Sequence, residues 1–106
     1  MIYSLTETAN ILIPKEFCSK GVRRVDAFIA ELKESGIITK SRSMNKYIHN
    51  KYVLTTWVVN NYPEVQLYFE NTWTDKGYYQ LKVTEEGLKN ILNLIYKIEK
   101  ETCDNE

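Results

Sequence analysis

The chain is poor in the residues that cross-link, kink or loosen a small fold. Its 106 residues include two cysteines, two prolines, four glycines and one histidine. Cys18 and Cys103 lie far apart and form no paired spacing, so reduced thiols in a cytoplasmic protein are expected. A chain of this length can bury a core without disulfides or metals. No apolar run approaches the length of a membrane span, which excludes a membrane partner from the expectations.

The few candidate nucleophiles and bases argue against catalysis. His49 has no carboxylate near it in the sequence to orient it, and neither cysteine belongs to an activating motif. The sequence contains no metal-ligand cluster and no glycine-rich loop that would cradle phosphate. We therefore expect no enzymatic activity, no catalytic residue, no metal and no cofactor.

The charges balance overall but not along the chain. The whole chain has 14 basic and 14 acidic residues, giving a formal charge of zero. Residues 1–55 hold nine bases and five acids, a net charge of +4, and the remainder therefore carries −4. Such asymmetry can orient a domain on an acidic partner, although an uneven solvated surface would produce the same count.

Two helices are predicted in the first half. Ser4 and Glu7 have the spacing of a capping box, and Pro14 ends the helix that follows. A second helix is predicted over residues 22–35, with Gly36 as its C-cap and a short strand after it. Its buried stripe is expected to consist of Val22, Val25, Phe28, Ile29 and Leu32.

Strands and a last helix are predicted in the second half. Residues 52–59 are rich in β-branched and aromatic side chains, and residues 65–73 alternate between apolar and polar. A turn at 75–77 leads into a third strand over 79–83. Thr84 is expected to cap a helix whose apolar stripe is Leu88, Ile91, Leu92, Ile95 and Ile98.

This order of parts is typical of a winged helix-turn-helix. The sequence therefore predicts one α+β domain over residues 1–101, with about three helices and a three-stranded antiparallel sheet or wing. Residues 102–106 are expected to fray.

Three segments carry a resemblance to a known family. Residues 4–12, 28–38 and 81–88 are similar to the opening helix, second helix and strand-to-helix signature of the phage antirepressor C-terminal domain, also called the KilA C-terminal or antirepressor-C domain. Residues 45–53 loosely match a tyrosine-bearing segment of that family, which often has glycine where this chain has Lys51. The resemblance implies a phage or prophage regulator with a winged-helix, DNA-binding fold.

Double-stranded DNA is the favoured partner. The helix over 22–35 is the candidate reader, because recognition helices place their N-terminal residues against base edges and arginine can donate twice to guanine. A basic connector between this helix and the strands is the candidate phosphate-binding surface. The predicted DNA contacts are Lys20, Arg23, Arg24, Lys40, Arg42, Lys46 and Lys51.

A protein-binding module is the alternative. Eight tyrosines and two tryptophans, with zero net charge, suit a protein interface better than a DNA interface. Such a module would inhibit a phage repressor or a host defence factor without binding DNA. A homodimer, which would place two reading helices on DNA half-sites, is expected through the helix over 88–100, with Leu94 near the contact because Leu94 falls off the predicted buried stripe. A monomer would favour the protein-binding alternative.

Overall fold

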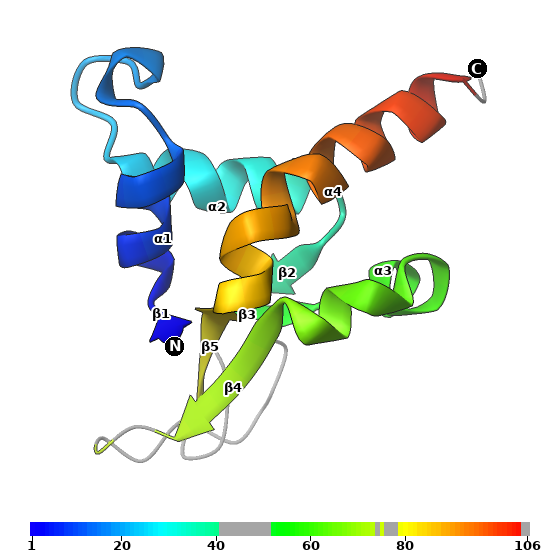
Figure 1. Cartoon of the computed structure of the whole chain (residues 1–106). Coiled ribbons are helices and arrows are strands. Elements are labelled where there is room, and N and C mark those ends of the chain that lie inside the picture. Colours follow the sequence, from blue (N-terminus) through cyan, green and yellow to red (C-terminus); the bar gives the residue numbers. More distant parts are fainter. Residues whose placement is uncertain (41–51, 74, 76–78, 105–106) are drawn as a thin grey trace.

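The protein has an α+β fold with a small antiparallel sheet, and the described residues contain four α-helices (Figure 1). The computed structural model describes residues 1–40, 52–73, 75 and 79–104. In chain order the elements are β1 (Ile2–Tyr3), α1 (Leu5–Leu12), η1 (Lys15–Phe17), α2 (Arg24–Glu34), β2 (Ile38–Lys40), β3 (Tyr52–Leu54), α3 (Thr56–Asn61), η2 (Pro63–Leu67), β4 (Phe69–Trp73), β5 (Tyr79–Thr84) and α4 (Glu85–Asp104).

The ends of the first two helices mostly follow the sequence signals. Ser4 and Glu7 form the predicted capping box, in which each side chain accepts a hydrogen bond from the other residue's backbone N–H. Gly36 has the positive φ of +80° that a helix C-cap favours. One boundary was wrong: α2 begins at Arg24, and Val22, expected in its buried stripe, is 45% exposed ahead of the helix.

The strands form two antiparallel sheets. In the larger sheet β5 lies between β1 and β4, with Ile2 opposite Thr84 and Phe69 opposite Val83. In the smaller sheet β2 pairs with β3. The antiparallel pairing of the predicted second and third strands is confirmed, and the turn residues 76 and 77 lie outside the described part of the chain.

The strand predicted over residues 52–59 was half wrong. It ends at Leu54, and helix α3 follows because the Thr55 hydroxyl accepts a hydrogen bond from the Val58 N–H at 3.1 Å. The same hydroxyl donates to the Gly36 carbonyl at 2.5 Å, which ties the start of α3 to the end of α2. The two hydrogen bonds of the Thr55 hydroxyl stabilise a helix start here, and this effect outweighs the strand preference of the β-branched residues that follow.

The alternation predicted over residues 65–73 also failed in part. Residues 63–67 form η2, so period-two alternation begins only at Phe69. Leu67 and Trp73, both expected to face inward, are 66% and 58% exposed. Tyr62, which the core pattern did not require, is buried and donates its hydroxyl hydrogen to Glu101 on α4.

Helix α4 turns a different face to the core from the one predicted. Leu94 is only 4% exposed, whereas Leu92 is 44% exposed. The prediction that Leu94 lies on the outer surface near a dimer contact was therefore wrong, because packing within one chain already covers it. The core comprises Ala9, Phe28, Leu32, Ile37, Ile38, Val58, Tyr62, Val65, Phe69, Leu81, Val83, Ile91, Leu94, Ile95 and Ile98. The helix itself continues to Asp104, into the segment where fraying was expected.

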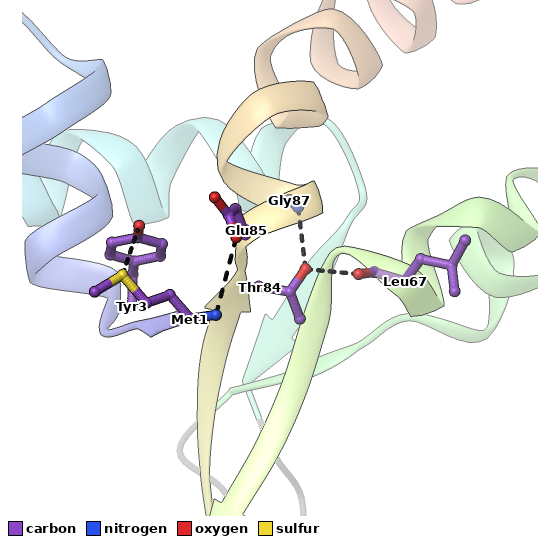
Figure 2. A network of polar contacts seen from close by, with 6 residues as sticks. All are labelled: Met1, Tyr3, Leu67, Thr84, Glu85 and Gly87. Carbon is purple, nitrogen blue, oxygen red and sulfur yellow. Dashed lines mark hydrogen bonds and ion pairs between the residues drawn. The ribbon is translucent and has the colours of Figure 1, made fainter.

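The start of α4 is fastened to the junction of η2 and β4 (Figure 2). As predicted, Thr84 caps the helix, and its hydroxyl accepts a hydrogen bond from the Gly87 N–H at 3.0 Å. That hydroxyl donates to the Leu67 carbonyl at 2.6 Å, and the Thr84 N–H donates to the Tyr68 carbonyl at 3.0 Å. Gly87 lies so close to Tyr68 that a Cβ atom would overlap the same carbonyl oxygen.

Candidate nucleic-acid interface

A basic hollow lies where α1, the α1–α2 connection and the start of α2 meet. Figure 1 shows the connection projecting beyond both helices. The hollow has a volume of about 640 Å³, and its lining includes the four cationic side chains Lys15, Lys20, Arg23 and Arg24. Among the described residues that line it there is no Asp or Glu. Three of the predicted DNA contacts are thus brought together by the fold.

Arg24 occupies the first turn of α2 and reaches back to α1. Its Nη1 donates to the carbonyl of Asn10 at 3.3 Å. Asn10 lies in the last turn of α1, where the carbonyl oxygens lack partners within the helix and carry the negative end of the helix dipole. Arg24 is half-buried, and this contact joins the start of α2 to the last turn of α1. Its role is therefore partly structural.

Arg23 stands at the N-cap of α2 and is held by the acid one turn later. Its Nε donates to Asp26 Oδ2 at 2.9 Å and its Nη2 donates to Asp26 Oδ1 at 3.2 Å. The hydrogen bond and the charge of Asp26 raise the pKa of the Arg23 guanidinium, which therefore stays protonated throughout the physiological range. The Arg23 side chain is 77% exposed, so the pair faces solvent at the rim of the hollow.

The sequence predictions missed Lys15, which follows Pro14 and lies in η1. The available signal was the Pro14 break, which ends α1 and precedes η1, the element that carries Lys15. Phe17 at the end of η1 is 81% exposed and was also missed as a surface residue.

The predicted basic connector is only partly described. Lys40 is exposed on β2 opposite Tyr52, and it does not line the hollow. Arg42, Lys46 and Lys51 lie outside the described residues. The structure therefore brings Lys20, Arg23 and Arg24 together, and it places Lys40 on a separate element.

A second hollow continues from the first. It has a volume of about 280 Å³ and shares Thr6, Arg23 and Val25 with the basic hollow. It extends toward Tyr52 on β3 and Gln80 on β5. Asp26 and the apolar side chains of Leu5, Ile29 and Leu81 also line it, so Arg23 stands between a basic hollow and a mixed one.

An acidic hollow of about 490 Å³ lies at the start of α4. Glu70, Glu85 and Glu86 line it together with the apolar side chains of Ile2 and Leu67. The N-terminal ammonium group lies 4.0 Å from a carboxylate oxygen of Glu85 (Figure 2). The uneven charge in the sequence thus corresponds to two distinct surfaces, one basic and one acidic.

The described residues contain no group of three or more His, Cys, Asp or Glu side chains arranged to hold a metal ion. No described helix is both long enough and apolar enough to cross a membrane. Comparison of the chain with protein-family models, with curated proteins and with solved structures found no match.

Proposed function

We propose that the protein is a small DNA-binding regulator of the phage or mobile-element type, built on a winged-helix scaffold. The observation that carries the proposal is the convergence of Lys15, Lys20, Arg23 and Arg24 on one hollow at the start of α2. Lys15 belongs to η1, Lys20 to the connection after it, and Arg23 and Arg24 to the start of α2. Clustered Lys and Arg side chains neutralise phosphates and release counterions, which provides most of the affinity of such proteins for DNA.

In this proposal α2 is the reading helix. Its N-terminal residues would contact base edges, while Lys15 and Lys20 on the connection would contact the backbone. The exposed outer side of α2 includes Ala30, a small side chain that permits close approach to a groove wall. The β4–β5 hairpin would serve as the wing of this scaffold.

Binding of a fluorescent random-sequence duplex across a salt series tests the proposal. Each phosphate contact contributes about −0.9 to the slope of log affinity against log salt. With three or four contacts, affinity should fall by about 40- to 150-fold between about 50 and 200 mM salt. A protein that binds no duplex at low salt would contradict the proposal.

The acidic hollow favours a second candidate, a module that binds a basic protein partner. Ile2 and Leu67, 43% and 66% exposed, lie among Glu70, Glu85 and Glu86. Lys89 and the N-terminal residue also line the hollow, where three acidic side chains outnumber the one basic side chain. Exposed apolar side chains rimmed by charged groups are typical of a protein interface. The partner implied by the sequence analysis is a phage repressor or a host defence factor.

A double variant, Ile2→Ser with Leu67→Ser, separates the two candidates. We expect it to keep the parent's affinity for duplex DNA, because neither residue lines the basic hollow. If the protein instead acts on a protein partner, this variant should lose that partner while Lys15→Ala with Lys20→Ala keeps it.

A further inference from the structure

The hydrogen bonds between Arg23 and Asp26 fix which edge of the guanidinium faces outward. Asp26 accepts from Nε at 2.9 Å and from Nη2 at 3.2 Å, so it occupies the side edge of the group. A guanidinium has five N–H donors, and this arrangement uses two of them. The end edge, formed by Nη1 and the second hydrogen of Nη2, keeps two parallel donors. That edge has the geometry that matches O6 and N7 of guanine in the major groove.

The surroundings of the pair support a role in recognition. Arg23 and Asp26 have side chains 77% and 51% exposed, and an exposed ion pair contributes little to folding stability. Arg23 also lines both the basic hollow and the hollow that continues from it. Lys15, Lys20 and Arg24 surround it with positive charge that would hold a phosphate backbone nearby. By contrast, Arg24 donates to Asn10 and is tied to α1.

We propose that Arg23 reads a guanine base in the bound DNA and that Asp26 is the positioning residue that aims its guanidinium. This inference rests on the proposed DNA-binding function and adds a specificity to it. Asp26 touches no base in this arrangement. Its negative charge opposes phosphate, so its contribution is to hold Arg23 in one rotamer before DNA arrives, which lowers the entropy lost on binding.

Selection from a randomised duplex library tests the inference, with the parent, Arg23→Lys and Asp26→Asn compared side by side. The parent should select a site with one guanine at which 7-deazaguanine, which lacks the N7 acceptor, weakens binding. A bidentate contact predicts discrimination of about 5- to 150-fold at that position. Arg23→Lys keeps the charge and loses the fork, so it should lose this discrimination while random-duplex affinity stays within about twofold.

The Asp26→Asn variant distinguishes a positioning role of Asp26 from a simple effect of its negative charge on DNA affinity. Removal of an acid near DNA should leave random-duplex affinity equal or higher, yet discrimination at the guanine should fall. Glu86→Gln is the matched control, because it removes one exposed acid from the first turn of α4, as Asp26→Asn removes one from the first turn of α2. It should leave the guanine preference unchanged. The melting curve of Arg23→Lys should overlay that of the parent, and Asp26→Asn and the control, each of which removes an acid from the first turn of a helix, should lower Tm by at most about 5 °C.

The outcomes distinguish this inference from the proposed function. If the parent binds duplex DNA without sequence preference, or if Arg23→Lys keeps the full guanine preference, the reading role of Arg23 is overturned and DNA binding stands. If Asp26→Asn keeps the full guanine preference, the positioning role of Asp26 is overturned. If the parent binds no duplex at low salt, both proposals are overturned.

Discussion

Replacement of Gly87 by Ala should destabilise the protein, although the same change on an exposed helix is usually favourable. Gly87 lies in the first turn of α4, where Ala normally improves stability by about 1 kcal/mol because it restricts the unfolded chain. Here the added Cβ would lie 2.8 Å from Val83 Cγ1 and would overlap the Tyr68 carbonyl oxygen. Cβ atoms in real proteins essentially never approach a neighbour within 3.0 Å.

The clash cannot be relieved by a flexible side chain, because the main obstacle is backbone. The Tyr68 carbonyl also accepts the Thr84 N–H at 3.0 Å, and the Thr84 hydroxyl holds the neighbouring Leu67 carbonyl. Separation of α4 from this junction would cost about 1–3 kcal/mol of packing and about 1 kcal/mol for a lost hydrogen bond. After the helix-propensity gain is subtracted, we expect a net loss of about 1–3 kcal/mol.

Thermal melting followed by circular dichroism measures this loss. A net change of this size should lower Tm by roughly 5–15 °C in a domain of about 100 residues. Asn93→Ala, at an exposed position of the same helix, is the control and should leave Tm equal or slightly higher. A Gly87→Ala variant that melts at or above the parent's temperature would refute the close approach of α4 to the η2–β4 junction.

Three further predictions concern charge and assembly. A hydrogen bond to Glu99, then burial and nearby carboxylates, raise the pKa of Glu31 above its ordinary 4.5. The contribution of Glu31 to folding stability is therefore present at low pH and is lost as pH rises through the raised pKa. In a pH series of melting curves, Glu31→Gln should flatten that loss of stability and raise Tm at pH 7. The hydrogen bond to Glu101 raises the pKa of Tyr62 to about 12, so the folding stability should decline as pH rises from about 10 to 12. In alkaline unfolding curves, Tyr62→Phe should remove that decline. Any dimer formed through α4 should use the outward-facing Leu92, which is 44% exposed. Leu92→Glu should therefore convert such a dimer to a monomer, as measured by light scattering. An unchanged dimer mass would exclude that face of α4.

Local signals in the sequence predicted the ends of helices well. Ser4 with Glu7, Gly36 and Thr84 all cap helices as expected, because a cap depends on a few neighbouring atoms. Thr55 is also a cap, and it was missed because it stands inside a run of strand-forming residues. Its second bond, to the Gly36 carbonyl, joins residues 19 apart and could not be read locally.

Residue spacing in the sequence could not predict which face of α4 is buried. Leu92 is three residues before Ile95 and Leu94 is three residues after Ile91, so helical spacing permits either leucine as the inner residue. The packing of α4 against the rest of the domain selects Leu94. Tertiary contacts, rather than periodicity, decided this position.

The sequence predicted the residues that α2 contributes to the candidate site better than those that the loop before it contributes. Arg23 and Arg24 were readable as charges at a helix start, and the spacing of Arg23 and Asp26 is that of an ion pair on one helix face. Lys15, in η1 after Pro14, lines the same hollow. A short 3₁₀ segment such as η1 has no strong sequence signature, so the position of Lys15 could not be predicted.

The salt dependence of DNA binding by a paired set of variants tests the central claim most directly. Lys15→Ala with Lys20→Ala removes two positive charges from the basic hollow, whereas Lys89→Ala with Lys100→Ala removes two from α4. If the basic hollow contacts DNA, the first variant should make the slope of log affinity against log salt shallower by about 1.8, and the second should leave the parent's slope unchanged. Equal slopes for the two double variants would contradict the assignment of this surface to DNA.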